Sequence, residues 1–194
     1  MGAFDVEAPN WGRIPAVRVT GAAVASADGS LTLPTDAGPL RASLHEFGAR
    51  LRLGPDARDY GILLQSPHAL PALVESAPGV TRIVSGDRVL EIGHEPLSFV
   101  LSVAGRNVQS SPSDGHFVRR FRLPPFARVG DAWLVSVELG HDTPVYGLGE
   151  KWGRLDRRGQ LVRSYNHDAL GVNAEVSYKN APFAWSPEGW GVFV

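Results

Sequence analysis

The sequence predicts an all-β protein made of antiparallel strands, arranged as a sandwich or a barrel. Glycine and proline occur 22 and 15 times in 194 residues and interrupt the chain every few residues. No long stretch therefore keeps the apolar period of a helix. Short segments in which apolar and polar residues alternate recur instead, which is the pattern of half-buried strands. Several short strands at this spacing are typical of antiparallel sandwiches and barrels.

Each predicted strand corresponds to one such segment. Residues 81–84 and 88–92 flank Ser85-Gly86-Asp87, which is a hairpin turn signal. In the predicted strand 116–123, Phe117 and Phe121 share a face, because residues four apart on a strand point the same way. The proline-rich stretch from Leu53 to Ala77 is predicted to be mostly loop and edge strand. The remaining predicted strands are 30–33, 49–53, 97–103, 133–139, 183–185 and 190–194, the last two joined by a turn at 186–189.

Length and composition predict one domain over residues 1–194 and argue against several functions. The formal net charge of −1 favours neither nucleic acid nor an anionic membrane as a partner. The sequence has no cysteine, which excludes disulfides, thiolate chemistry and zinc–cysteine sites. No apolar run is long enough to span a membrane, and Met1–Arg13 lacks the pattern of a signal peptide. We therefore expect a cytoplasmic protein.

The last predicted strand, Trp190–Val194, is apolar and stops abruptly. Chain termini are usually polar, and an exposed apolar strand tends to pair with other chains. This leads us to expect that the natural polypeptide continues beyond Val194 and that the domain is truncated at its C-terminal end.

Residues 146–194 differ in composition from the rest of the chain. They contain three of the five tryptophans and many polar residues, and they show little strand pattern between Gly159 and Ala181. A long polar loop on a β scaffold is a common place for binding residues. An ordinary solvated excursion fits the same pattern, so composition alone does not decide between the two.

No complete motif for catalysis, a cofactor or a metal ion is present. Gly147-Leu148-Gly149 lacks the third glycine and the βαβ unit of a dinucleotide fingerprint, so we expect a tight turn or a close backbone approach there. His167 and Asp168 are adjacent and would point to opposite faces of an extended segment, which argues against a metal site. Asp156, Asp168 and Glu175 could form a carboxylate pair, but loop residues lack the rigid spacing that a glycosidase needs. The sequence predicts neither a metal nor a cofactor.

From Val145 onward, the order of several motifs resembles a known family. The motifs are Val145-Tyr-Gly-Leu-Gly-Glu-Lys-Trp-Gly153, Arg158-Gly-Gln160, Tyr165-Asn-His-Asp-Ala169, Ser177-Tyr-Lys-Asn-Ala-Pro-Phe183 and Gly189-Trp-Gly-Val-Phe-Val194. Together they resemble the N-terminal domain of glycoside hydrolase family 31, which includes α-glucosidases and α-xylosidases. Residues 39–64 and 81–139 are compatible with the same domain and are less specific.

The resemblance implies an antiparallel β-sandwich of the galactose-mutarotase-like type, placed ahead of a catalytic (β/α)8 barrel. The family's nucleophile and acid/base are aspartates of that barrel, and its signatures do not occur in this sequence. The resemblance therefore implies no catalytic residue here and an inactive chain when it is alone. It also implies that Asp168, with Asn166 and Tyr165, lies on a loop that reaches the barrel and binds an α-linked glucoside or xyloside. Family members similar to α-xylosidases often have Trp where this chain has Tyr165, so the sugar is left open.

Each of these residues also has a structural interpretation. Asp168 is typical of turns and N-caps, Asn166 could only shape the loop, and Tyr165 could pack in the interior or stack on a sugar. Glu150 and Lys179 are expected to pin the base of the loop. The other aromatic residues are expected mainly in the core, namely Tyr146, Tyr178, Trp152, Trp185 and Trp190.

The leading hypothesis is an accessory domain of a retaining α-glycosidase that completes a substrate subsite of its own barrel. A stand-alone carbohydrate-binding module is the alternative, and the sequence that follows Val194 would distinguish the two. A mutarotase-type epimerase would need a histidine acid and a carboxylate base in one concave site. The spacing of His116, His141 and His167 does not favour such a site.

Overall fold

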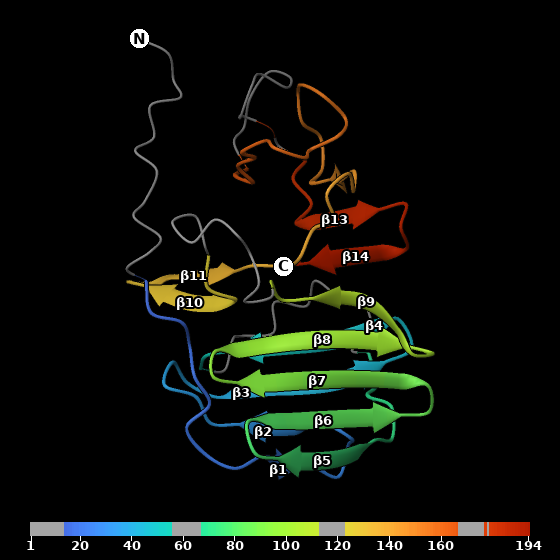
Figure 1. Cartoon of the computed structure of the whole chain (residues 1–194). Helices are drawn as coiled ribbons and strands as arrows, with labels where there is room; N and C mark the ends of the chain where they lie inside the picture. The colour runs from blue at the N-terminus through green and yellow to red at the C-terminus, as the bar shows by residue number, and fades with distance from the viewer. Residues whose placement is uncertain (1–13, 56–66, 113–122, 167–176, 178) are drawn as a thin grey trace. The chain divides into compact units, whose positions relative to one another are not determined.

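The structure, a computed structural model, describes residues 14–55, 67–112, 123–166, 177 and 179–194 (Figure 1). Every helix or strand in these ranges is a β-strand, and all pairs of neighbouring strands are antiparallel. The predicted all-β class is confirmed. The chain divides into two compact units, Met1–Glu138 and Leu139–Val194, here called unit 1 and unit 2. This division does not test the prediction of a single domain over residues 1–194, which stays a prediction.

The first sheet of unit 1 has four strands in the order β1-β2-β3-β4. They are β1 (Val24–Ala25), β2 (Leu31–Leu33), β3 (Leu40–His45) and β4 (Gly48–Leu53). The sequence predicted β2 and β4 and missed β3. In β3 the apolar positions Leu40, Ala42 and Leu44 are buried and Arg41 is exposed, which is the alternation of a strand. β3 lacks β-branched residues, so its propensity signal is weak.

The second sheet of unit 1 has five strands in sequence order, β5-β6-β7-β8-β9. They are β5 (Leu73–Ala77), β6 (Val80–Ser85), β7 (Arg88–His94), β8 (Leu97–Val103) and β9 (Arg106–Ser110). Short turns join consecutive strands, and Ser85 pairs with Arg88 across the predicted hairpin turn. β5 lies at the edge of the sheet, with Pro71 two residues before it and Pro78 directly after it. The predicted edge strand in this stretch is confirmed.

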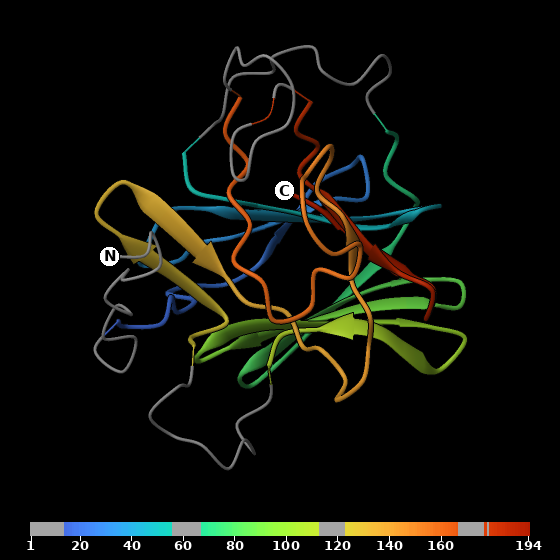
Figure 2. The same cartoon turned by 90° about the horizontal axis from the view of Figure 1, so that it is seen from above.

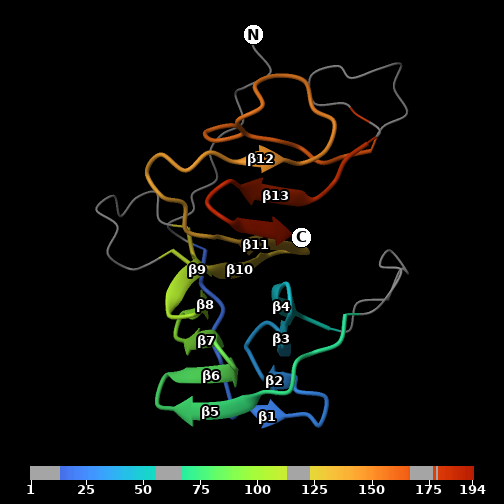
Figure 3. The same ribbon diagram turned by 90° about the vertical axis from the view of Figure 1, so that its right-hand side faces the viewer.

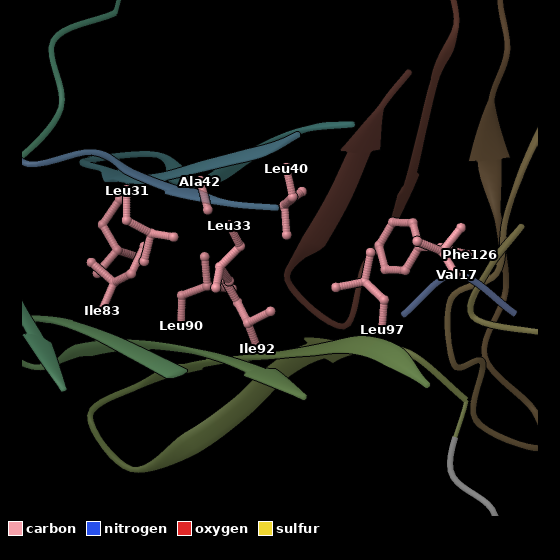
Figure 4. Close-up of a cluster of buried hydrophobic side chains, with 11 residues drawn as sticks. Val17, Leu31, Leu33, Leu40, Ala42, Ile83, Leu90, Ile92, Leu97 and Phe126 are labelled. Carbon is pink, nitrogen blue, oxygen red and sulfur yellow. The ribbon is translucent and has the colours of Figure 1, made fainter. Parts of the chain in front are cut away.

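The core of unit 1 lies between these two sheets, which form separate layers (Figures 2 and 3). Side chains from both layers meet there, and Figure 4 shows Leu31, Leu33 and Leu40 pointing toward Ile83, Leu90 and Ile92. All six are at most 1% exposed. The galactose-mutarotase-like β-sandwich that the sequence predicts is consistent with this arrangement.

A hairpin and an N-terminal segment extend the core at one end of unit 1. The hairpin consists of β10 (Phe126–Val129) and β11 (Ala132–Val135). Val17 donates from its amide to the Phe126 carbonyl at 2.8 Å and accepts from the Leu97 amide at 2.7 Å. The strand predicted at 133–139 is shorter in the structure and ends at Val135. Ser136 still donates its amide to the Pro125 carbonyl at 2.8 Å, but Pro125 has no amide to donate in return, and the Glu138 amide donates to the Ser110 carbonyl at 2.7 Å. The predicted strand 116–123 lies almost wholly outside the described residues.

Unit 2 contains one three-stranded sheet in the order β12-β13-β14. The strands are β12 (Tyr146–Gly147), β13 (Phe183–Ser186) and β14 (Trp190–Phe193). β13 and β14 form the hairpin predicted at the end of the sequence, with Ser186 opposite Trp190. The described residues between β12 and β13 form loops without a strand.

Candidate functional site

Two of the three predicted sugar-binding residues lie on the described loop between β12 and β13. The Tyr165 side chain is 70% exposed, which argues against the interior packing considered above. Asn166 is exposed and forms an isolated parallel bridge with Ser177. Asp168 lies outside the described residues, as do His167 and Glu175. The structure thus brings together Asn166 and Ser177, the residues that flank segment 167–176, and the sugar-binding roles stay predictions.

Two glycines let the backbone of the loop pass close to the chain that enters β13. Gly147 and Gly149 have φ angles of 104° and 81°, in the region that favours glycine. A Cβ atom at Gly149 would lie 2.3 Å from the Lys179 carbonyl oxygen, and the Glu150 amide donates to that same oxygen at 2.8 Å. The expected close backbone approach is confirmed. It also shows that the backbone groups of Glu150 and Lys179 pin the base of this loop.

The ammonium group of Lys151, the next residue, connects three separate points of the chain. Its Nζ donates to the Arg163 carbonyl, to Ser177 Oγ at 3.1 Å and to the side-chain oxygen of Asn180. Asn180 Nδ2 in turn donates to Asn166 Oδ1 at 2.6 Å and to the Ser177 carbonyl at 3.1 Å. Ser177 is fully buried. We call Lys151, Asn166, Ser177 and Asn180 the loop clamp.

Sequence reasoning did not find the loop clamp. Lys151 and Asn180 belong to motifs that the sequence singles out, but no local pattern indicates that the two motifs meet. Lys151 is separated from its three acceptors by 12, 26 and 29 residues. The sequence indicated a link between Lys151 and Asn180 only in that both belong to the series of motifs that resembles the family.

A second cation lies close to the loop clamp. The Arg157 side chain is buried and donates to the carbonyl oxygens of Arg154 at 2.6 Å and Lys151 at 3.3 Å. Its Nε has no hydrogen-bond partner within the described residues. Burial, and to a lesser extent the positive charge of Arg157, lower the pKa of Lys151. Neutral oxygen acceptors therefore bind the Lys151 ammonium group, although burial and the charge of Arg157 disfavour its charged form.

Asp156 holds the backbone that leads into the turn at residues 158 and 159. Its Oδ1 accepts from the amides of Arg158 at 2.9 Å and Val145 at 3.1 Å. These two bonds, the Arg158 bond first, lower the pKa of Asp156 by favouring the ionised carboxylate. Among the three carboxylates considered for a catalytic pair, Asp156 is thus occupied by backbone groups, while Asp168 and Glu175 lie outside the described residues.

The aromatic residues of unit 2 are more exposed than the sequence predicted. Trp152 is 73% exposed, so the prediction that it lies in the core is wrong. It follows the Gly149 turn on a loop, where no sheet face in the described part covers it. Trp185 is 42% exposed, so the prediction that it lies in the core is also wrong. Its ring centroid lies 5.1 Å from that of its cross-strand partner Tyr146. Trp190 is half-buried, and Tyr178 lies outside the described residues.

The structure gives no support to an epimerase or metal site in the part that it describes. His141 is almost fully exposed. In the described ranges its one ion pair is with the carboxylate of the neighbouring Asp142, at 2.9 Å. His116 and His167 lie outside the described residues. Within the described ranges, no three histidine or carboxylate side chains lie close enough to hold a metal ion. In the same ranges, no helix has the length and apolar character needed to cross a membrane.

The sandwich fold and the motif order are those of a galactose-mutarotase-like domain. A sequence profile described as the glycosyl hydrolase 31 N-terminal galactose mutarotase-like domain matches residues 42–194. Since the match covers most of the chain, the chain belongs to this family. The family that the motifs resembled is thereby confirmed.

Curated relatives and solved structures agree with this assignment. The chain is 43% identical over 59 residues to α-xylosidase XylQ of Lactiplantibacillus pentosus, and 43% identical over 61 residues to an α-xylosidase of Emericella nidulans. These stretches are 30% and 31% of this chain and only 8% of each relative. A glycoside hydrolase family 31 dextranase of Flavobacterium johnsoniae, solved with glucose, matches with a TM-score of 0.69 and 17% identity over 92% of this chain and 22% of that one. At this identity the structural match shows a shared fold.

Proposed function

We propose that this chain is the N-terminal accessory domain of a retaining α-glycosidase that hydrolyses α-glucosidic or α-xylosidic bonds. The catalytic aspartates belong to a (β/α)8 barrel of the same enzyme, and the segment around Asp168 contributes to a sugar-binding subsite of that barrel. The 194-residue chain alone does not hydrolyse glycosides, because the reacting groups lie on the barrel.

The observation that carries this proposal is the loop clamp, because it joins both ends of segment 167–176 at one place. Arg163 and Asn166 come before the segment, Ser177 and Asn180 come after it, and all are hydrogen-bonded to Lys151 or Asn180. The residues on the two sides of the segment are thus fixed relative to one another, which suits a binding segment between them. The names of the relatives, two α-xylosidases and a dextranase, support an α-linked sugar as the substrate.

The proposed role of Asp168 follows from the chemistry of its side chain. An ionised carboxylate accepts hydrogen bonds from sugar hydroxyls, and each such charge-assisted bond contributes roughly 1.5–3 kcal/mol where water is excluded. Asn166 holds the clamp through its side-chain oxygen, and the exposed ring of Tyr165 offers a flat face beside the segment. In this proposal Asp168 binds, Tyr165 forms the wall of the subsite and Asn166 shapes the loop.

The substitution Asp168→Ala in the complete enzyme tests the proposal. We expect kcat/KM for aryl α-glucosides and aryl α-xylosides to fall ten- to a hundredfold, which corresponds to about 1.4–2.7 kcal/mol. Asp142→Ala serves as the matched control, because its carboxylate is almost fully exposed in the same unit and, within the described residues, forms an ion pair with the exposed His141. Wild-type kinetics in Asp168→Ala, with the control also unchanged, would exclude the proposed role.

Calorimetric titration of the 194-residue chain with glucose and xylose tests the alternative of a stand-alone binding module. We expect weak or undetectable binding, because most of the proposed pocket belongs to the barrel. Micromolar affinity would favour the binding module instead. An aldose mutarotation assay on the same chain is expected to show no rate above that of buffer.

A further inference from the structure

The loop that follows β12 in unit 2 has apolar side chains on its outside and an arginine on its inside. We call residues 152–165, orange in Figure 3, the 152–165 loop. Arg157, in the middle of this loop, is only 7% exposed. A solvated loop shows the opposite arrangement, since water favours guanidinium groups over indole and leucine side chains. The loop's exposed large apolar and aromatic side chains are Trp152 (73%), Leu155 (79%), Leu161 (72%) and Tyr165 (70%).

Internal hydrogen bonds hold the backbone of the 152–165 loop. The buried Arg157 guanidinium donates to the carbonyls of Arg154 at 2.6 Å and Lys151 at 3.3 Å. The Gln160 amide donates to the Arg157 carbonyl at 3.0 Å. These bonds engage the backbone directly before three of the exposed apolar residues, and they leave those side chains outside. A partner that binds the loop does not have to order it first, which favours association.

The residue types of the loop are those of a protein interface. Tryptophan, tyrosine and arginine most often dominate the binding energy of such interfaces, whereas lysine and glutamate are depleted there. Residues 152–165 contain one tryptophan, one tyrosine and four arginines, with no lysine and no glutamate. Leu155 and Leu161 offer no polar group to the hydroxyls of a sugar. Exposure and composition together therefore favour a protein surface as the partner.

The size of the related enzymes indicates which protein surface this is. The dextranase that shares the fold is matched over only 22% of its chain, and each α-xylosidase over 8%. In the proposed enzyme, most of the polypeptide therefore lies outside these 194 residues and is covalently joined to them. Covalent linkage gives the rest of the enzyme a high effective concentration at the loop, which a second copy of the chain lacks.

We propose that the 152–165 loop is the docking surface of unit 2 for the catalytic domain of the same enzyme, with Trp152 and Leu155 as anchoring side chains. This inference rests on the proposed function, in which the chain is one domain of a larger α-glycosidase. It adds the surface through which the accessory domain is held, and it does not depend on the role of Asp168.

Limited digestion of the complete enzyme with trypsin tests the docking surface, because Arg154 and Arg163 are exposed residues of the loop. We expect both sites to resist cleavage in the native enzyme. Trp152→Ser should speed cleavage at both sites about tenfold or more, because truncating a hot-spot residue weakens an interface by at least that factor. Phe47→Ser is the matched control, since Phe47 is an equally exposed aromatic residue of unit 1, at 70%. It should leave cleavage of the loop unchanged.

Hydroxyl-radical footprinting with mass spectrometry gives a second measurement that needs no variant. Trp152 and Tyr165 should react much more slowly in the native complete enzyme than in the urea-unfolded enzyme. Phe47 should react at nearly the same rate in both. If Trp152→Ser does not fold, Leu155→Ser removes the other anchoring side chain and is expected to speed cleavage of the loop in the same way.

The outcomes separate the docking surface from the function on which it rests, because none of these measurements uses a substrate. The docking surface is wrong if Trp152 is no better protected than Phe47 in the native enzyme, or if neither anchor substitution speeds cleavage. Protection that disappears on dilution would show that a second copy covers the loop, and would also exclude the inference. Wild-type kinetics of Asp168→Ala together with a protected loop would exclude the sugar-binding role and leave the docking surface intact.

Discussion

At the scale of single residues, polar side chains bonded to backbone groups hold the loops of unit 2. Asp156 and Lys151 both act in this way, one as an acceptor and one as a donor. Their pKa values are both lowered, for opposite reasons. Hydrogen bonds favour the charged form of Asp156, whereas burial disfavours the charged form of Lys151.

The lowered pKa of Asp156 predicts a pH-dependent contribution to stability. A carboxylate whose pKa falls on folding stabilises the protein above its ordinary pKa of about 4, and this contribution is lost as the pH falls through the lower folded-state pKa. Asp156→Asn should therefore lower the thermal unfolding midpoint at pH 7, and its difference from wild type should narrow below about pH 4. Unfolding scans of both proteins between pH 7 and pH 2 check this. A difference that is constant over that range would contradict it, and Asp142→Asn should show little difference throughout.

Residue-level prediction succeeded where the property is local. Gly147 and Gly149 were expected to allow a close backbone approach, since only glycine tolerates their φ angles without strain. The roles of Lys151 and Asn180 could not be predicted, because a hydrogen bond between distant residues leaves no pattern in the sequence around either of them. Tyr165 and Asn166 were singled out through a family resemblance; both are exposed, and their sugar-binding roles stay predictions.

At the scale of elements, short turns define most of unit 1. Ala104 and Gly105 form the two-residue loop between β8 and β9, and both have positive φ angles, of 49° and 74°. This matches the turn that suits the twist of a β-hairpin, which favours Asn-Gly at its centre. Alanine is unfavourable in the left-handed region, so Ala104 fits this turn less well than asparagine would.

Ala104→Asn is therefore expected to stabilise the protein, by about 0.5 kcal/mol, because asparagine tolerates the left-handed conformation better than alanine. The thermal unfolding midpoint should rise by roughly 1–2 °C for a chain of this size. Ala132→Asn is the matched control, because Ala132 is an exposed strand residue outside the positive-φ set, and it should be neutral or destabilising. Equal effects of the two substitutions would show that the turn conformation is not responsible.

Element prediction worked for hairpins with a glycine turn and alternating flanks, such as β6–β7 and β13–β14. It missed β3, whose apolar positions include an alanine, and it made β11 too long. β11 was predicted too long because alternation indicates which side chains face inward and not where strand pairing stops. Pairing of β11 ends at Ser136, because its partner Pro125 accepts the Ser136 amide but has no N–H to donate in return.

At the scale of the whole molecule, the sandwich core of unit 1 is the main source of stability that the structure identifies. Leu90→Ala removes a fully buried side chain between the two sheets and should cost about 2–5 kcal/mol. The control Val24→Ala changes a residue that is 64% exposed and should stay within about 0.5 kcal/mol of wild type. Differential scanning calorimetry of both variants checks the contrast. A small effect of Leu90→Ala would mean that the core between the sheets contributes less than its burial indicates.

The fold class could be predicted from alternation and from the frequency of glycine and proline. The order of strands within the sheets and the division into two units could not, because a period of two does not say which strand lies beside which. The meandering order of β5 to β9 needs only short turns between neighbours. The motif order from Val145 onward allowed the family to be recognised before the fold was known.

β5 forms one edge of its sheet, and the residues at this edge affect how molecules associate in concentrated solution. Glu75 is exposed at the centre of this edge strand, and prolines flank it on both sides. A second molecule that approached this edge would meet a negative charge, and the prolines offer it no amide groups. Glu75 and the flanking prolines therefore disfavour ribbon-like growth from one copy to the next at this edge.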